Sequence, residues 1–424
     1  MKQVYNLHQY FHKERYKLIT KEKNIKKING TITSPNGFYA SGVHAGLRYK
    51  RKDLGLIYSE KPASVAAVYT LNLFPAAPIA ITKKSIAFSN KLQAVLVNSG
   101  CANACTGKKG EDDAYLMRAW CADHLNLPEH LVAIASTGVI GEYLKMDRLK
   151  SGIDKLTVDN KLEDGEDFGQ AILTTDTVIK TICYEVLIDG KIVTIAGSAK
   201  GSGMIHPNMA TMLGFVTTDA TISSGQLQTL LKEVTDKTFN QITVDGDTST
   251  NDMVLVMANG AIEHEELTES HPDWANFVAA FQLVCEDLAK KIARDGEGAT
   301  KLIEVNVNGA SSLKNANQIA KTIVGSNLVK TAVYGEDANW GRIIGAIGYS
   351  GVEGKFNQID ISINGVTVLF GSKPVEFNEE EAKIALKNEV IYIDVHLHEG
   401  DALGTAWGCD LTYDYVKINA SYRT

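Results

Sequence analysis

Two Asx-Gly dipeptides, each set between strand-like runs, constrain the fold of this chain more than any other feature. Asp189-Gly190 separates ICYEVLI from KIVTIAG, and Asn364-Gly365 separates ISI from VTVLF. Both residues of such a pair tolerate the positive φ angles that a two-residue turn between antiparallel strands requires. The sequence therefore predicts two β-hairpins, and antiparallel pairing in the sheets that contain them.

A parallel arrangement is expected nearer the start of the chain. QAVLVN at 93–98 and LVAIA at 131–135 are short apolar runs of strand type, and the amphipathic segment 111–125 lies between them with acidic residues in its first turn. This pattern predicts a strand, helix, strand unit. Further amphipathic helices are expected at 224–240, 273–294 and 379–387. We therefore expect an α/β fold of layered sheets covered by helices.

Charge and hydropathy exclude several classes of protein. The chain has 43 Lys plus Arg against 50 Asp plus Glu, a formal charge of -7, which argues against binding nucleic acid or an anionic membrane through a broad basic field. No apolar run approaches the roughly 20 residues of a membrane span. Residues 1–20 lack the apolar core of a secretory signal, and Glu14 and Glu22 are atypical of a transit peptide. We expect a cytoplasmic protein.

No pattern for a bound metal or cofactor emerges. The 6 cysteines include no CxxC pair. His396 and His398 alternate in VHLHEG, but a third ligand is missing, so a solvated strand face is the simpler interpretation. The segment 243–254, TVDGDTSTNDMV, has the acidic residues and glycine of a metal loop but not the spacing of a calcium loop. We expect no bound metal or cofactor.

The segment from Lys200 to Ala220 is an anomaly, because its first half fits no regular element and Thr211 begins a strand-like run. An ordinary loop would use its glycines for tight turns, with Thr211 as a β-branched strand residue. A functional alternative is an internal nucleophile. The Thr211 hydroxyl would attack the Ala210 carbonyl, and hydrolysis of the resulting ester would free Thr211 as a new N-terminus whose amine is its own base.

Two segments upstream could serve such a nucleophile. In IASTGVIGEYL the 131–135 strand continues into Thr137 and Gly138, whose hydroxyl and exposed main-chain N–H are the kind of donors that stabilise a tetrahedral oxyanion. A polar strand end followed by a glycine turn explains the same residues. Thr174 lies in ILTTDTVIK directly before the first hairpin, where a loop cap is the plainer interpretation.

Two polar clusters lie late in the chain. RDGEGATK ends the 273–294 helix, and its glycines could bring Glu297 close to a ligand, although a helix C-cap explains Gly296 equally well. NASYRT spans Asn419 to Thr424, a polar segment that would ordinarily be a frayed end.

The motifs run in one order from about Thr31 to Thr424. They are SGVHAGLRYKRKDLGLI, NSGCANACTG, ASTGVIG, TTDT, KGSGMIHPNMATML, TVDGDTSTNDM, GEGATK, GEDANWGRI and INASYRT. Together they closely resemble the glutamate N-acetyltransferase, or ornithine acetyltransferase, family of arginine biosynthesis, in its bacterial type. Only residues 1–30 are atypical.

The resemblance implies a self-cleaving precursor. The scissile bond maps onto Ala210-Thr211 and gives an alpha subunit of 1–210 and a beta subunit of 211–424. Thr211 becomes the acetyl acceptor, with Thr137 and Gly138 as the oxyanion hole. The implied substrate contacts are Thr174, Lys200, Thr211, Glu297, Asn419 and Thr424. The implied fold is an α/β structure that resembles the N-terminal-nucleophile hydrolases in its chemistry.

The reaction implied by the resemblance moves acetyl from N-acetylornithine to glutamate, giving ornithine and N-acetylglutamate, with acetyl-CoA as a possible second donor. Alpha and beta chains of one precursor are expected to pair as a heterotetramer. Two rival readings are a self-processing aminopeptidase or amidase, in which water takes the acyl group, and a non-catalytic amino-acid-binding protein. Acetate release without glutamate would identify the first, and an uncleaved chain would be the first sign of the second.

Overall fold

The computed structural model describes residues 24–158, 162–206 and 212–421. These residues form two compact units, a larger one of 24–240 and 247–288 and a smaller one of 241–246 and the described residues from 289 onward. Each unit contains one β-sheet, and each is described by itself. These units are regions of the folded chain, whereas the expected products 1–210 and 211–424 are pieces of a cleaved chain. The division into units therefore does not test the expected cleavage.

The larger unit is built on a sheet that has nine strands in the described residues. Their order is β1-β6-β7-β8-β10-β3-β4-β5, with β2 paired to β3. The strands are β1 (Ile25–Ile28), β2 (Phe38–Val43), β3 (Leu54–Tyr69), β4 (Lys91–Cys101), β5 (Val132–Val139), β6 (Lys180–Ile188), β7 (Lys191–Lys200), β8 (Leu213–Thr218) and β10 (Met253–Ala258). Strands β6 and β7 form the first expected hairpin, with φ of 48° at Asp189 and 71° at Gly190.

The expected strand, helix, strand unit is confirmed as β4, α3 and β5. The two strands pair in parallel, with Ala94 opposite Val132. Helix α3 (Gly107–His124) begins at Gly107 and not at Glu111, so the prediction of acidic residues in its first turn was wrong. The sequence Gly-Lys-Lys-Gly at 107–110 has the composition of a loop. In the structure Gly110 packs so closely against Thr106 and Asn103 that a Cβ would clash, and with this packing the helix begins at Gly107.

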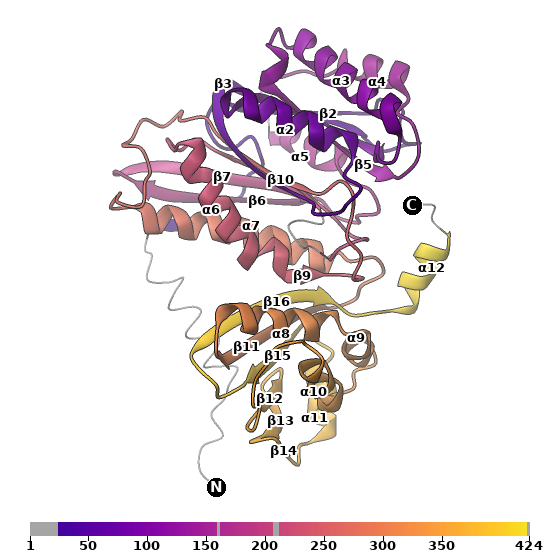
Figure 1. Cartoon of the computed structure of the whole chain (residues 1–424), viewed down its shortest axis with the longest axis vertical. Helices are drawn as coiled ribbons and strands as arrows, with labels where there is room; N and C mark the ends of the chain where they lie inside the picture. The colour runs from indigo at the N-terminus through magenta and orange to yellow at the C-terminus, as the bar shows by residue number, and fades with distance from the viewer. Residues whose placement is uncertain (1–23, 159–161, 207–211, 422–424) are drawn as a thin grey trace. The chain divides into compact units, whose positions relative to one another are not determined.

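Helices cover both faces of the larger sheet (Figure 1). On one face, α3 with α2 (Ala77–Ser89) and α4 (Met146–Ile153) bury Ile81, Met117 and Leu149 against β3, β4 and β5. On the other face, Phe168 of α5 (Leu162–Ala171) meets Phe215 of β8 edge to face, with ring centroids 5.5 Å apart. The expectation of sheets covered by helices is confirmed.

The two long helices expected after residue 220 are present. Helix α6 (Ser224–Lys237) begins after Ser223, whose side chain accepts a hydrogen bond from the Gln226 N–H, and it is followed by the short η2 (Phe239–Gln241). Helix α7 (Trp274–Arg294) passes from the larger unit into the smaller one. A further short turn, η1 (Glu129–Leu131), leads into β5.

The smaller unit contains a sheet of seven strands in the described residues, in the order β14-β13-β12-β15-β11-β16-β9. They are β9 (Ile242–Thr243), β11 (Leu302–Ala310), β12 (Asp360–Ile363), β13 (Val366–Phe370), β14 (Lys373–Pro374), β15 (Val390–His396) and β16 (Ala402–Cys409). The second expected hairpin, β12 to β13, turns at Asn364-Gly365, both with positive φ.

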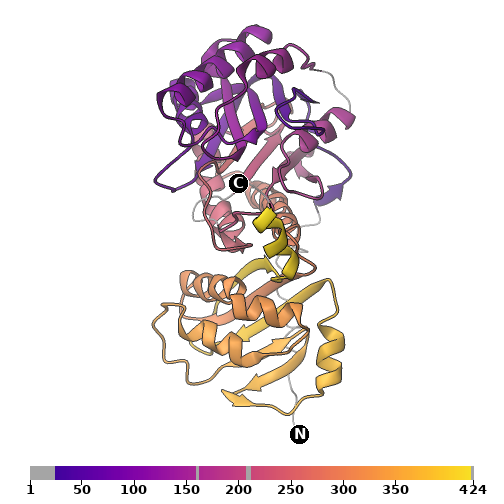
Figure 2. The same ribbon diagram turned by 90° about the vertical axis from the view of Figure 1, so that its right-hand side faces the viewer.

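Three helices lie against one face of this smaller sheet (Figure 2). They are α8 (Leu313–Gly325), α9 (Asn327–Tyr334) and α10 (Trp340–Gly348), whose apolar residues pack on Val305 and Ile393 of the sheet. Helix α11 (Glu379–Ala385) fulfils the expectation for 379–387, and α12 (Tyr413–Ser421) follows the last strand. In the described part of the chain, we find no helix with the length and apolar character needed to cross a membrane.

Candidate active site

The two expected oxyanion donors lie where β5 ends beside β4. Ser99 is opposite Thr137 and Gly100 is opposite Gly138, and the register shifts at the next residue. Gly138 has φ of 135°, and a Cβ there would lie 2.3 Å from the carbonyl carbon of Gly100. Only glycine fits this crossing of two strand ends. The local backbone therefore depends on the glycine that the sequence indicated.

Thr137 is held by Lys200, the last residue of β7. Lys200 Nζ donates to Thr137 Oγ1 across 3.1 Å in a buried setting. An ammonium group has no lone pair, so the Thr137 oxygen must accept this bond and its own proton stays available for another acceptor. A hydroxyl that is polarised by a cation and free to donate is suited to stabilising an oxyanion.

Asp176 organises the segment that carries Thr174. Its Oδ1 accepts hydrogen bonds of 2.7 Å from Lys180 Nζ and from the Gly201 N–H, and its Oδ2 accepts one of 2.9 Å from the Thr174 N–H. Burial raises the pKa of Asp176, but the charges of Lys180 and Lys200, with the hydrogen bonds from Lys180 and Gly201, outweigh it and hold the pKa below its usual value. Asp176 is therefore an ionised anchor between Thr174 and the end of β7.

Arg48 fixes the other side of the Thr174 segment. Its guanidinium donates to the carbonyl oxygens of Leu173, at 2.5 Å, and of Thr174, at 2.8 Å. The Arg48 stem lies against Gly100, where a Cβ would come within 2.8 Å of its Cγ. Thr174 is thereby tied to the end of β4, which pairs with the end of β5 that carries the expected oxyanion donors.

Two buried asparagines brace this strand end, and the sequence analysis missed both. Asn98 accepts a hydrogen bond of 2.6 Å from Ser136 Oγ and donates to the Cys101 carbonyl. The Asn251 amide donates to the carbonyls of Ala102, at 2.6 Å, and of Ser136, at 2.8 Å. Both asparagines lie in motifs that we quoted, NSGCANACTG and TVDGDTSTNDM, but nothing in the spacing indicated which carbonyls they bind.

Glu297 and Asn419 meet in the smaller unit. Asn419 Nδ2, in α12, donates to Glu297 Oε2 across 2.8 Å. Gly298 allows this contact, because a Cβ there would lie 2.6 Å from the Tyr415 N atom. Its φ of 71° also favours glycine, and Thr412 Oγ1 donates to the Gly298 carbonyl. The start of α12 thus packs directly on the GEGATK loop.

The expected site residues therefore fall into two described groups. Thr137, Thr174 and Lys200 lie close together in the larger unit through the contacts above, and Glu297 pairs with Asn419 in the smaller unit. Ala210, Thr211 and Thr424 lie outside the described residues. Their expected roles as cleavage site, nucleophile and substrate contact remain predictions.

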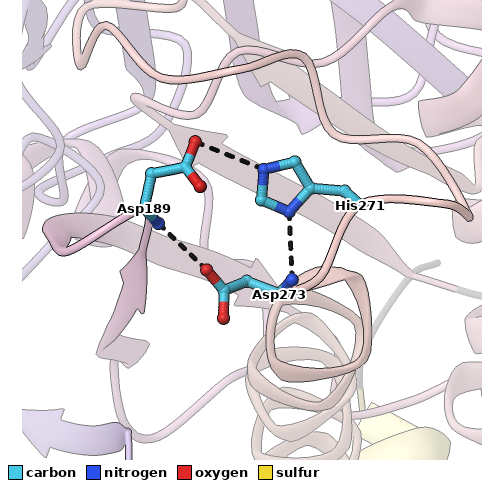
Figure 3. A group of neighbouring side chains, drawn as sticks. All are labelled: Asp189, His271 and Asp273. Carbon is cyan, nitrogen blue, oxygen red and sulfur yellow. Dashed lines mark hydrogen bonds and ion pairs between the residues drawn. The ribbon is translucent and has the colours of Figure 1, made fainter.

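A possible metal-binding group lies elsewhere in the larger unit. Within the residues that the structure describes, Asp189, His271 and Asp273 bring three possible ligand atoms together (Figure 3). The Asp273 N–H donates to His271 Nδ1 at 3.0 Å, so the ring proton sits on Nε2 and points to Asp189 Oδ2 at 3.3 Å. With both ring nitrogens engaged, His271 has no lone pair left for a metal. The group fastens the β6–β7 turn to the start of α7.

Comparison with known proteins gives consistent matches over nearly the whole chain. A family model described as the ArgJ family matches residues 39–424. The arginine biosynthesis bifunctional protein ArgJ of Geobacillus kaustophilus is 62% identical over 396 residues, which cover 93% of this chain and 97% of that protein. The protein of the same name from Bacillus subtilis is 60% identical over 403 residues, covering 95% and 99%.

Solved structures also match. The structure of ornithine acetyltransferase from Mycobacterium tuberculosis, complexed with ornithine, is 34% identical to this chain with a TM-score of 0.41. The match covers 44% of this chain and 100% of that one.

Proposed function

The chain belongs to the ArgJ family, and from this premise we propose that it moves acetyl from N-acetylornithine to glutamate through an acetyl-Thr211 intermediate. The coarser conclusion is that it is an acetyltransferase of arginine biosynthesis. Membership of the family supports that conclusion, as do relatives 60% and 62% identical that carry the name arginine biosynthesis bifunctional protein.

In the proposed first half-reaction, the Thr211 oxygen attacks the acetyl carbonyl of N-acetylornithine while the Thr211 α-amine takes the hydroxyl proton. The negative charge that develops on the carbonyl oxygen is stabilised by the Thr137 hydroxyl and the Gly138 N–H. When the tetrahedral intermediate collapses, the C–N bond breaks, the proton passes to the leaving amine, and ornithine departs. An amide is a poor acyl donor, so this charge stabilisation is essential.

The second half-reaction runs the same steps in reverse. The amino group of glutamate attacks acetyl-Thr211, the C–O bond breaks, and the Thr211 oxygen regains its proton as N-acetylglutamate leaves. Thr174, Lys200, Glu297, Asn419 and Thr424 are proposed to hold the two amino acids. Lys200 suits a substrate carboxylate and Glu297 suits an ammonium group.

Self-cleavage between Ala210 and Thr211 would supply the free Thr211 amine. The products, 1–210 and 211–424, are proposed to stay together as alpha and beta chains of a heterotetramer in the cytoplasm. Because the relatives are called bifunctional, acetyl-CoA is proposed as a second acetyl donor for glutamate. No bound cofactor enters this scheme.

The contact between Lys200 Nζ and Thr137 Oγ1, 3.1 Å long, supports this proposal most strongly. It leaves the Thr137 proton directed to a further acceptor, beside a glycine that cannot be replaced without a clash with Gly100. An ordinary polar strand end needs neither feature.

The proposal is tested by mass analysis of the purified protein and by transfer assays with N-acetylornithine and with acetyl-CoA. A fragment beginning Thr-Met-Leu-Gly is expected, and Thr211→Ala should stay one chain because alanine has no hydroxyl to attack the Ala210 carbonyl. Acetate release that does not require glutamate would instead identify an amidase. Efficient cleavage of Thr211→Ala would contradict the proposed nucleophile.

A further inference from the structure

The motif SGVHAGLRYKRKDLGLI has no role in the mechanism proposed above. Its residues 44–53 connect β2 to β3. Two arginines of this connection, Arg48 and Arg51, donate hydrogen bonds to the segment that carries Thr174, which lies about 125 positions further along the chain. The connection therefore does more than join two neighbouring strands.

The buried carboxyl group of Asp53 gives this connection its shape. Its oxygens accept hydrogen bonds from three main-chain N–H groups, those of Ala45 at 2.6 Å, Gly46 at 3.1 Å and Arg48 at 2.8 Å. The Asp53 carbonyl accepts a further bond of 2.9 Å from the Ser99 N–H in β4. The connection is thus folded around a buried acid and fixed to β4, and the Arg48 side chain leaves it from a defined position.

The two arginines bind three main-chain carbonyl groups of one short segment. Arg48 donates to the carbonyl oxygens of Leu173, at 2.5 Å, and of Thr174, at 2.8 Å. Arg51 donates to the Asp176 carbonyl at 3.1 Å. A guanidinium carries its donors in a rigid plane and can bind two carbonyls in one geometry, which a lysine ammonium on a flexible stem cannot reproduce. The segment 173–176 is therefore held at three points by the 44–53 connection.

The main-chain groups of Thr174 are both occupied. Its N–H donates to Asp176 Oδ2 at 2.9 Å, and its carbonyl accepts from Arg48. The residue is half-buried, so the side-chain hydroxyl is the polar group that Thr174 can offer to a substrate. A hydroxyl contributes most to binding when it is held in one position, and here the fixed main chain sets that position.

We propose that Arg48 is a positioning residue for substrate binding that acts through Thr174 and not by contact with the substrate, with Arg51 as a second grip on the same segment. The inference rests on the proposed function, in which Thr174 contacts substrate. Without the Arg48 fork, Thr174 stays in the structure but its hydroxyl is less well fixed. Substrate binding then weakens, while the chemistry at Thr211 is unchanged.

A double-mutant cycle between Arg48 and Thr174 tests this inference. Arg48→Lys keeps the charge but loses the fork, and Thr174→Val removes the hydroxyl. Each single variant should raise KM for N-acetylornithine by about three- to tenfold, the effect of one hydrogen bond, with a smaller change in kcat. In the Thr174→Val background, Arg48→Lys should raise KM by less than about twofold, because the contact through which it acts is already gone.

Arg118→Lys is the matched control, because Arg118 is also half-buried in the larger unit but donates to Ser85 and Glu129. It should keep the wild-type KM and kcat. An unchanged KM in Arg48→Lys, or an equal rise in KM in both backgrounds, would overturn the inference and leave the proposed acetyl transfer standing. An unchanged KM in Thr174→Val would contradict the proposed substrate contact itself, and the inference with it.

Arg51→Lys covers the case in which Arg48→Lys does not fold. Arg51 is exposed, so its replacement should leave the core intact. It should raise KM for N-acetylornithine by about two- to threefold, and this rise should disappear in the Thr174→Val background. A rise of equal size in both backgrounds, or no rise in either, would overturn the inference. A wild type that transfers no acetyl from N-acetylornithine would overturn the proposed function as a whole.

Discussion

At Thr137, one contact in the structure says more about the role of the hydroxyl than the residue type alone. The motif STG suggested Thr137 and Gly138 as oxyanion donors, but a polar strand end followed by a glycine turn explained the same residues equally well. The bond from Lys200, 63 positions further along the chain, supports the proposed role as a donor, because the Thr137 oxygen accepts it and the Thr137 proton is left for another acceptor. Sequence reasoning assigned Lys200 to substrate alone and did not anticipate this second partner.

Replacing Thr137 with valine is expected to leave the fold intact and to slow transfer. Loss of one oxyanion donor typically lowers kcat by about 10²- to 10³-fold, roughly 3 to 4 kcal/mol, with a smaller effect on KM. Steady-state kinetics with N-acetylornithine and glutamate measure both. Thr235→Val in α6 is a matched control, because the Thr235 hydroxyl is buried and has no hydrogen-bond partner among the residues that the structure describes. A rise in KM alone would make Thr137 a substrate contact.

At the scale of elements, the turn before β10 reaches β5, which carries the proposed oxyanion donors, through Asn251. Its amide donates both protons to carbonyls, one in Ser136 and one in Ala102, and so fixes the peptide plane that leads into Thr137. The sequence suggested a metal loop for this segment and then excluded it. In the structure this segment holds the ends of β4 and β5 at a fixed distance from each other, through the Asn251 bonds to Ala102 and Ser136.

Asn251→Ala should therefore lower kcat for acetyl transfer by about tenfold, about 1.4 kcal/mol, because the oxyanion donors lose their fixed orientation. It should also destabilise the protein by about 1 to 3 kcal/mol, since two buried carbonyls lose a donor. Kinetics and denaturant unfolding measure the two effects. Asn306→Ala, at a residue of the smaller unit that is only 6% exposed, should reduce stability only. An equal loss of kcat in both variants would contradict the bracing role.

The segment between β10 and α7 carries a pH-sensitive contact. His264 Nε2 accepts from the Thr221 N–H at 2.9 Å, while its Nδ1 faces the Glu265 carbonyl at 2.7 Å. The ring must be neutral to accept this bond. Burial lowers the pKa of His264, the hydrogen bond to Glu265 and the charge of Asp189 oppose this, and His271 and Lys191 add to it.

Because the folded-state pKa of His264 is depressed, its contribution to stability is fully present above the ordinary pKa of about 6.5. The contribution is lost as pH falls below that value, where the unfolded chain takes up a proton before the folded one does. His264→Gln, which can keep both hydrogen bonds without titrating, should flatten the fall in Tm between about pH 6.5 and about pH 5. Identical slopes for wild type and variant would exclude His264 as the source.

Local signals predicted some elements well and others not at all. Asp189-Gly190 and Asn364-Gly365 gave both hairpins, because the turn chemistry lies in the two residues themselves. Strand β3 was not anticipated, since Glu60, Lys61 and Pro62 interrupt its apolar pattern. In the structure these residues are exposed, and the pairing with β4 is irregular between Tyr58 and Ala63. Tertiary pairing thus extends a strand across a break that sequence alone marks as a boundary.

At the scale of the whole molecule, the motifs do not follow the spatial units. The smaller unit takes 241–246, which contains β9, from the middle of the chain and joins it to residues from 289 onward, which begin with the last residues of α7. The sequence analysis found motif residues for both units, but nothing in the sequence indicated that residues 241–246 would join the smaller unit. A two-residue strand such as β9 has too little pattern to be recognised before its partner β16 is known.

The last motif of the sequence contains Asn419, which bonds Glu297 within the smaller unit, and removal of this motif tests its proposed role in substrate binding. Deleting residues 419–424 takes away the Asn419 bond to Glu297 and the predicted contact of Thr424. Transfer from N-acetylornithine should lose at least about tenfold in kcat/KM, about 1.4 kcal/mol. Self-cleavage should survive, because we expect that step to use the same oxyanion donors as acetyl transfer, and these donors, Thr137 and Gly138, belong to the larger unit.

Asn419→Ala separates the two parts of this effect, since it removes the Asn419 amide, which bonds Glu297 and the Tyr415 carbonyl of its own helix, and keeps the remaining residues of the segment. Gel analysis follows cleavage, and steady-state kinetics follow transfer. If Asn419→Ala loses as much kcat/KM as the deletion, the loss comes from the Asn419 side chain and its contact with Glu297. If Asn419→Ala loses less, the rest of the loss comes from residues 420–424. If the shortened enzyme keeps the wild-type kcat/KM, the NASYRT segment is an ordinary solvated end, and Glu297 must act without it.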